Sequence, residues 1–280
     1  MFVKILTAVV LTSMIQVSAL ANETITMFIG SRPGGNMFDQ SQLLADHLRS
    51  QGYTVNIEVV GSCNKAQSGM ANHKDRSIMV VFNAFAKLPG CEDTMPNSNN
   101  YVANLLTFPL MFCSRPDLDV NAIIRDQRPA TVAGIKSNPA VIATSLNSKF
   151  KYVPYANSGA ASQGFLAGDT DIIMTTVPKA SELVSAGKAR CGVTTATKPM
   201  LGADPASRLY GQWAYRDLVA AVGVIQKGFS NKEIESLRKA VRGISGSKAW
   251  HQYAEKTESD INVDFSLDRF QRTSEQWAQQ

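Results

Sequence analysis

The stretch that decides the fold is residues 24–60, which read TITMFIGSRPGGNMFDQSQLLADHLRSQGYTVNIEVV. Residues 24–29 pass from alternating to apolar and predict a strand. Residues 30–36 form a dense cluster of turn residues, and residues 38–49 place their leucines on one face, which predicts a helix. Residues 53–60 alternate again and predict a second strand. The opening of the chain is therefore a β-α-β unit.

The same alternation of short strands and helices continues to the end of the chain. It predicts an α/β fold with mainly parallel sheets flanked by helices. The expected strands are residues 77–82, 108–113, 130–134, 151–155, 171–176 and 190–195, and the expected helices are residues 138–148, 162–167, 179–186, 231–242, 247–257 and 266–278.

The N-terminus has the pattern of an export signal. Lys4 is the only charged residue before Glu23, and the apolar run Ile5–Val17 follows it. Small residues at Ala19 and Ala21 give the spacing that a signal peptidase reads. The apolar core is too short for a typical membrane anchor, although an uncleaved anchor is the alternative. We expect residues 1–21 to be a cleaved signal peptide and the mature protein to be periplasmic.

Composition limits the classes of function. Removal of residues 1–21 would leave 259 residues with 27 basic and 23 acidic side chains, a net charge of +4. This length allows one large domain or two medium lobes. The basic residues are scattered, without a basic run or basic helix, so a nucleic-acid partner is not expected. A mild positive charge favours a small anionic ligand.

The four cysteines, Cys63, Cys91, Cys113 and Cys191, follow an export signal, which favours disulfides over free thiols. Four cysteines allow three complete pairings. Cys63 and Cys91 each follow a predicted strand of the first half, which favours their pairing and leaves Cys113 with Cys191, without excluding the other pairings.

Three loops are candidates for anion binding. Pro33-Gly34-Gly35-Asn36 lies between a predicted strand and a helix N-terminus, where adjacent glycines let backbone N–H groups approach a ligand. The stretch Tyr155–Ser162 is a second small-residue loop that enters a helix, and Ser137-Asn138-Pro139 is a third. Helix N-termini attract carboxylates and phosphates. Each loop alone is also compatible with an ordinary turn, but together they predict a carboxylate-binding cleft.

Catalytic patterns are weak in this sequence. His47, His73 and His251 lie far apart, without the spacing of metal ligands. No nucleophile elbow occurs, and Asp169 and Asp171 have the spacing of a turn feature at a strand entrance. We therefore expect a binding protein without cofactor or metal, not an enzyme. An exported enzyme with an unrecognised site is the alternative.

One block of sequence is more specific than these signals. It comprises Val153-Pro154-Tyr155, Gly159, Phe165-Leu166-Ala167-Gly168-Asp169-Thr170-Asp171-Ile172, Pro178, Ala186-Gly187-Lys188-Ala189-Arg190 and Val193-Thr194-Thr195. This block resembles, without gaps, the middle of solute-binding proteins of tripartite tricarboxylate transporters, the Bug-type family. Pro33-Gly34-Gly35 and the following leucines look like the start of that family.

The resemblance implies a two-lobed periplasmic-binding-protein fold of the type II kind. Lobe 1 would be residues 22–112 plus 222–280, and lobe 2 residues 113–221. Such a protein closes by hinge rotation over a small organic anion, often a carboxylate, and delivers it to integral-membrane transporter subunits. We expect a monomer. A periplasmic sensor for a signalling partner is a second alternative.

The expected ligand-binding residues come from both lobes. They are Pro33, Gly34, Gly35, Asn36, Asn83, Ser137, Asn138, Tyr155, Ser158, Gly159 and Thr175. Four departures from the family pattern predict an altered pocket, and the first is a glycine-serine loop that is shortened around residues 134–138. Asp39 falls one residue later than the family's aspartate, Asn157 and Ser158 stand where the family has glycines, and Thr175 replaces an aspartate. Thr175 is therefore the expected determinant of ligand selectivity.

Overall fold

The computed structural model of the 280-residue chain describes residues 23–33, 36–83, 91, 95–135, 140–156, 158–210 and 220–278. The predicted signal peptide and four predicted loop residues, Gly34, Gly35, Ser137 and Asn138, lie outside the described residues. Within the described ranges, no helix is both long and apolar enough to cross a membrane.

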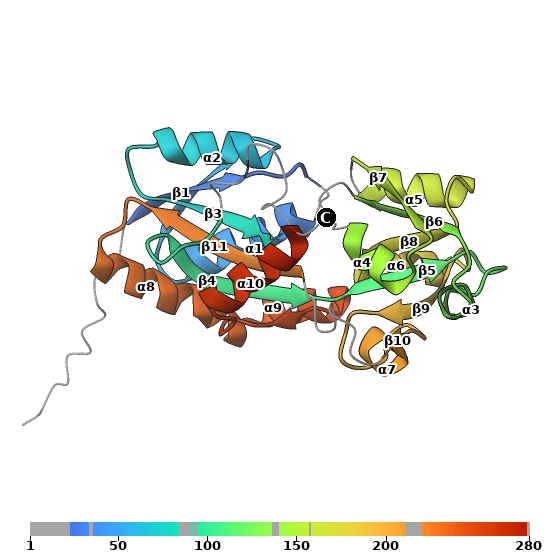
Figure 1. The fold of residues 1–280 in the computed structure, drawn as a ribbon. Helices are drawn as coiled ribbons and strands as arrows, with labels where there is room; N and C mark the ends of the chain where they lie inside the picture. The colour runs from blue at the N-terminus through green and yellow to red at the C-terminus, as the bar shows by residue number, and fades with distance from the viewer. Residues whose placement is uncertain are drawn as a thin grey trace, which may run out of the picture.

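The described strands form two separate sheets of six strands each (Figure 1). The first sheet has the order β12-β4-β11-β3-β1-β2. Its central strands are almost wholly buried, because both faces are covered by helices and the strands consist of apolar runs. Its members are β1 (Thr24–Ile29), β2 (Thr54–Val59), β3 (Ser77–Phe82), β4 (Tyr101–Phe108), β11 (Ala220–Lys227) and β12 (Asp260–Ile261).

The second sheet has the order β10-β9-β5-β8-β6-β7. Its members are β5 (Leu110–Ser114), β6 (Ala130–Ile135), β7 (Phe150–Tyr155), β8 (Ile172–Thr176), β9 (Arg190–Thr194) and β10 (Asp204–Pro205). The chain passes from the first sheet to the second between Phe108 and Leu110, and β11 belongs to the first sheet again. The two sheets with their helices confirm the two-lobed architecture.

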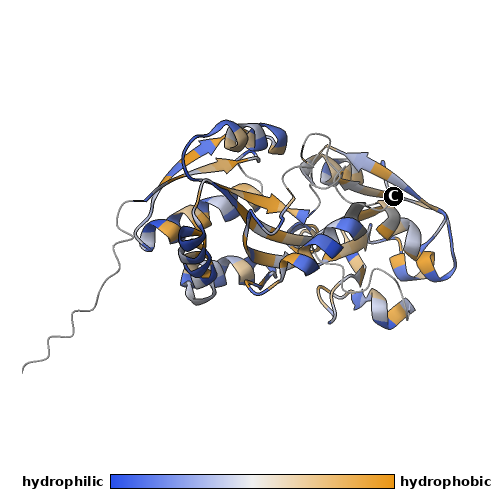
Figure 2. Cartoon of the chain, turned by 60° about the vertical axis from the view of Figure 1, so that its left-hand side comes forward, coloured by the Kyte–Doolittle hydropathy of each residue, from blue (hydrophilic) through white to orange (hydrophobic). Residues whose placement is uncertain are grey.

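Helices accompany both sheets, and their ribbons carry both hydrophilic and hydrophobic residues (Figure 2). Around the first sheet lie α1 (Asn36–Ser50), α2 (Cys63–Asn72), α8 (Asn231–Arg242), α9 (Lys248–Thr257) and α10 (Leu267–Ala278), with the short 3-10 helix η3 (Gly243–Gly246) between α8 and α9. Around the second lie α3 (Val120–Arg125), α4 (Ala140–Leu146), α5 (Ser158–Ala167), α6 (Val177–Ser185) and α7 (Ala206–Tyr210).

The prediction of mainly parallel sheets is wrong, because both sheets are mixed. Five of the ten strand pairings are parallel and five are antiparallel. Four of these antiparallel pairings involve β11, which runs antiparallel to β3 and β4, or β5, which runs antiparallel to β8 and β9; the fifth joins β12 to β4. A central strand that is buried on both faces carries the same apolar run whether it is parallel or antiparallel to its neighbours, so the sequence pattern does not reveal its direction.

The apolar core is continuous between the two sheets. One cluster of buried side chains includes Leu44 and Val80 beside the first sheet and Phe112 and Val132 in the second. Leu110, the first residue of β5, belongs to the same cluster and is 1% exposed. The strand crossing from β4 to β5 is therefore embedded in apolar packing.

The block that resembles Bug-type proteins has a structural explanation. Gly168 and Gly187 have φ angles of +87° and +65° just after α5 and α6, where a residue with a side chain would be strained. The Asp171 carboxylate accepts hydrogen bonds from the Thr131 backbone N–H (2.9 Å) and hydroxyl (2.8 Å), which connects the start of β8 to β6. The interpretation of Asp171 as a structural feature at a strand entrance is confirmed.

Candidate functional site

The facing ends of the two sheets meet near Pro109. Register places Thr176, the last residue of β8, opposite Leu110, and Phe108 opposite Ala220. Because β1, β2 and β3 are parallel to one another and antiparallel to β11, their C-terminal ends lie at the edge where β11 begins. By the same argument, β6, β7 and β8 end where β5 begins. We call these facing C-terminal ends, with the loops that follow them, the interlobe edge (Figure 1).

Helix N-termini gather at the interlobe edge. The helices α1, α2, α5 and α6 each follow a strand that ends there, so their first turns lie at this edge. The first N–H groups of a helix have no partner within the helix and carry the positive end of its dipole. The arrangement presents hydrogen-bond donors from both sheets to a common region, which favours an anion.

The first lobe's predicted residues have different environments. Pro33 lies in an exposed turn after β1, and Asn36 begins α1 and accepts a hydrogen bond on its carbonyl from the Tyr253 hydroxyl (3.3 Å). Asn83 is fully buried at the end of β3, and its Oδ1 accepts a hydrogen bond from the Ala221 N–H (3.1 Å). Asn83 thus connects β3 to the beginning of β11 at the interlobe edge.

The predicted residues of the second lobe lie at the ends of β7 and β8. Tyr155 is the last residue of β7, and Ser158 and Gly159 are the first two residues of α5. The Tyr155 ring packs against α5: a Cβ built on Gly164 would lie 2.1 Å from the Tyr155 hydroxyl oxygen. Thr175 is 5% exposed and lies next to the last residue of β8. The structure therefore brings these four residues to one end of the second sheet.

Arg32 is a residue of the interlobe edge that the sequence analysis did not select. It lies three residues after the end of β1, and its Cγ lies against the turn at Gly61, 3.7 Å from where a Cβ of that glycine would be. Among the described residues no carboxylate lies within 4.0 Å of its guanidinium. Its position inside the loop GSRPGGN is the signal that could have identified it.

Two serine hydroxyls near the interlobe edge are buried and have no hydrogen-bond partner among the described residues. Ser31 lies between β1 and α1, and Ser162 lies one turn into α5. Ser162 is 8% exposed. A buried hydroxyl without a partner costs free energy, so each of these groups is available to a ligand or an ordered water.

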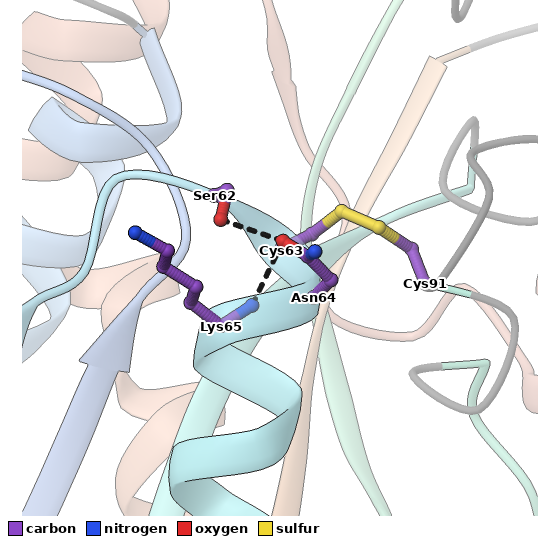
Figure 3. The surroundings of a disulfide bond; sticks show 5 residues. All are labelled: Ser62, Cys63, Asn64, Lys65 and Cys91. Carbon is purple, nitrogen blue, oxygen red and sulfur yellow. Dashed lines mark hydrogen bonds between the residues drawn. A yellow bond between two sulfur atoms is a disulfide. The ribbon is translucent and has the colours of Figure 1, made fainter.

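The disulfide Cys63–Cys91 confirms the favoured pairing (Figure 3). Cys63 is the first residue of α2, and Figure 3 shows Lys65 of the same first turn directed away from the sulfur atoms. A Cβ on Gly30 would lie 2.9 Å from the Cys63 Cα, so glycine permits the close approach of β1 and α2. The disulfide therefore fixes the N-terminus of α2 at the interlobe edge.

The second disulfide, Cys113–Cys191, also has the predicted pairing. Its cysteines lie directly opposite each other on the antiparallel strands β5 and β9, with a Cα–Cα distance of 3.8 Å. Both cysteines are buried. This bond stabilises the second sheet away from the interlobe edge.

A tyrosine supports the start of α1. Burial raises the pKa of Tyr253 to about 12, a hydrogen bond with Gln40 lowers it in part, and the Asp39 carboxylate raises it. The phenol therefore remains protonated at neutral pH and donates to the Asn36 carbonyl. In the described part of the chain, no three His, Cys, Asp or Glu side chains gather closely enough to hold a metal ion.

Several solved structures share this architecture over most of their length. The protein Rpa4515 of R. palustris, solved with adipate, has a TM-score of 0.70 and 16% identity, with 91% of this chain and 93% of that chain covered. MatC from Rhodopseudomonas palustris, solved with bound malate, has a TM-score of 0.69 and 17% identity over 91% and 97%. The periplasmic binding protein BugD has a TM-score of 0.67 and 15% identity over 91% and 94%.

No protein-family model matches this sequence, and no curated protein sequence matches it. The similarity thus lies in the arrangement of strands and helices over about nine-tenths of both chains, at identities below one in five. The chain has the fold of the periplasmic binding proteins of the Bug and TctC type.

Proposed function

We propose that this chain is an exported solute-binding protein that captures a small organic anion, a carboxylate in particular, at the interlobe edge. It would deliver this ligand to the integral-membrane subunits of a tripartite tricarboxylate transporter. In this proposal the lobe boundaries lie a few residues from the predicted 22–112 plus 222–280 for lobe 1 and 113–221 for lobe 2, because β5 of the second sheet begins at Leu110 and β11 of the first sheet begins at Ala220.

The observation that carries the proposal is the convergence of helix N-termini from both sheets. Four helices, α1, α2, α5 and α6, begin at the interlobe edge. Arg32 adds a guanidinium there that no described carboxylate neutralises. Backbone donors and one unpaired cation favour a compact anion over a neutral or positively charged solute.

The proteins of the same fold support the class of ligand. Rpa4515 was solved with adipate and MatC with malate, both of which are dicarboxylates. The present chain departs from the family pattern at several positions, including Thr175 in β8, which we propose as a determinant of selectivity. The ligand therefore need not be one of these two compounds.

Ligand capture would proceed by closure of the two lobes. The passage from β4 to β5 through Pro109 is a short strand crossing, a connection around which two lobes can rotate. Closure would remove the anion from water, which strengthens its hydrogen bonds to backbone N–H groups. The closed form would present a surface that the open form lacks, and a membrane subunit could recognise it. We propose that the protein works as a monomer in the periplasm.

A thermal-shift panel tests the proposal. Adipate, malate, succinate and citrate are compared with glucose and putrescine at equal ionic strength. A ligand at about 100 times its Kd adds roughly 2.7 kcal/mol to the free energy of unfolding. At about 2–4 °C per kcal/mol, this raises the Tm by about 5–11 °C. We expect at least one carboxylate to give such a shift, and a shift by glucose or putrescine alone would contradict the proposal.

A pair of variants tests the place of binding. Arg32→Gln should weaken the ligand about tenfold, as expected for loss of one charge-assisted hydrogen bond. Lys151→Gln also removes one positive charge, but Lys151 lies near the beginning of β7, at the end of that strand away from the interlobe edge. This variant should leave the affinity unchanged. Equal affinities for the two variants would show that Arg32 takes no part.

A further inference from the structure

A hollow of about 340 Å³ lies on the outer side of the first sheet. It is lined by the first three residues of β4, by Glu235, Arg238 and Arg242 of α8, and by the turn Val263–Leu267. Its lining shares no residue with the loops of the interlobe edge. Its volume is within the range of small-molecule sites. We call it the α8 hollow.

Of the described arginines without a carboxylate partner, one lines this hollow and one lies beside it. The structure describes twelve arginines, and nine of them lie within 4.0 Å of a carboxylate. The three described exceptions are Arg32, Arg242 and Arg269. Arg242 lines the α8 hollow, and Arg269 lies over the ring of Phe265, another lining residue, at 4.7 Å from the ring centroid.

The neighbouring Arg238 is held in place. Its Nη1 donates to Glu235 Oε1 (2.6 Å), and its Nη2 donates to the carbonyl of Tyr101 in β4 (2.9 Å). Arg242 follows four residues later on α8, so the two arginines share one face of the helix. The Tyr101 hydroxyl donates to the Phe265 carbonyl (2.8 Å), which fixes the wall between β4 and the turn.

The electrostatics of Tyr101 agree with this geometry. Burial raises the pKa of Tyr101 well above its usual range, and the positive charges of Arg242 and Arg238 lower it in part. Both guanidinium groups therefore lie near the aromatic wall of the hollow.

The acidic residues of the hollow do not neutralise Arg242. Glu235 is already bound to Arg238. Asp264 also lines the hollow, but among the described residues no Arg or Lys nitrogen lies within 4.0 Å of its carboxylate. The α8 side of the hollow is consequently its positive side.

We propose that the α8 hollow is a second anion site, separate from the interlobe edge, for a compact oxyanion with a carboxylate or phosphate group. Arg242 supplies the unpaired guanidinium, which can bind such a group in a bidentate manner, and Arg238 adds a fixed positive charge beside it. A ligand bound at this site would contact the first lobe alone, so its occupancy does not require closure of the lobes.

Titration monitored by amide resonances in two-dimensional NMR tests the site. Inorganic phosphate and succinate are added separately to the full mature protein, with chloride keeping the ionic strength constant. We expect saturable shifts at residues 101–103 and 264–267 with one or both anions. A response to phosphate alone or to succinate alone identifies the preferred group, and either supports the site.

Matched variants sharpen the test. Arg242→Gln should weaken the anion about tenfold, the effect of one lost charge-assisted contact. Lys239→Gln removes the same charge from an exposed position of α8 that does not line the hollow, and should change nothing. Equal weakening by both variants, shifts that grow linearly without saturation, or no shift at the named residues would each overturn the proposal. Gly35→Val should abolish ligand binding at the interlobe edge and leave these shifts intact, so the two sites can fail independently.

Discussion

Glu233 connects three parts of the first lobe, and its replacement by glutamine should destabilise the protein measurably. Its carboxylate binds Arg76, the residue before β3, and accepts the Ser230 N–H (2.6 Å) in the capping box of α8. Arg76 also lies 4.0 Å from Glu23. The side chains of Arg76 and Glu233 are 34% and 21% exposed, so solvent screens their attraction. Glutamine can keep the capping-box hydrogen bond, but it removes the negative charge from the first turn of α8, which contributes about 0.3–1 kcal/mol, and the ion pair, which at this exposure contributes up to about 1 kcal/mol.

We therefore expect Glu233→Gln to lose about 1–2 kcal/mol, which lowers the Tm by about 2–8 °C. Hydrogen bonds with Arg76 and Ser230 lower the pKa of Glu233 from its ordinary 4.5 to about 2. Because the folded pKa is the lower one, this stabilisation is present above pH 4.5 and is lost as the pH falls toward 2. The Tm difference between wild type and Glu233→Gln should be constant from pH 7 to 5 and about half as large near pH 3.3.

The assay is thermal unfolding of the two proteins at pH 7, 5 and 3.3, with Glu235→Gln as control. Glu235 lies on the same helix and pairs with Arg238, but its side chain is 70% exposed and caps no helix. Its replacement should cost less than about 0.5 kcal/mol. A Glu233→Gln protein as stable as wild type at pH 7, or a Tm difference that does not shrink at pH 3.3, would refute the reasoning.

Three further predictions concern stability. Gly164→Ala should lower the Tm although alanine favours helices, because the new Cβ would lie 2.1 Å from the Tyr155 hydroxyl oxygen. Gly246→Ala is the control, since a Cβ there meets open space, and a raised Tm for Gly164→Ala would contradict the packing of Tyr155 against α5. Lys227→Met should lower the free energy of unfolding in urea by about 1–2 kcal/mol, because the ammonium donates to the carbonyls of Met70, Ala71 and His73 at the end of α2. The control Lys256→Met changes an exposed residue and should cost almost nothing, and equal costs for the two variants would contradict the role of Lys227 in capping α2. Replacing Cys63 and Cys91 together by serine opens a loop with a sequence separation of 28 and should cost about 3–4 kcal/mol. If the wild-type protein keeps its Tm when a reductant opens the disulfide, the bond does not stabilise the fold.

The local elements that the sequence predicts well are those with a strong periodic pattern. The helix predicted at residues 231–242 coincides with α8, whose Ile234, Leu237 and Val241 are buried on one face. The strand predicted at residues 24–29 coincides with β1. In these segments the local sequence pattern agrees with the burial in the folded protein, so the pattern predicts the element correctly.

Other elements lack such a pattern. The helix α2 buries only Cys63, Ala66 and Met70, too few apolar side chains to produce a helical periodicity. The strand β4 contains Asn104, which is fully buried because its side-chain amide donates to the carbonyls of Leu106 and Asn262. Long-range contacts of this kind are absent from any local window of sequence. The directions of β5 and β11 depend on such contacts as well.

The candidate site was predictable in kind more than in detail. The small-residue loops indicated helix N-termini, and Tyr155, Ser158, Gly159 and Thr175 do lie at one end of the second sheet. Arg32 was overlooked, because the absence of a described carboxylate near its guanidinium is a property of the folded chain. The contact of Asn83 with β11 likewise joins residues 138 positions apart.

The most direct test of the central claim is native mass spectrometry of the protein purified from its native host without denaturation. The account predicts that one small organic acid is bound per chain, that it is released on unfolding, and that Gly35→Val, still folded by its Tm, carries none. A bound solute without an anionic group, or the same acid retained by folded Gly35→Val, would contradict it.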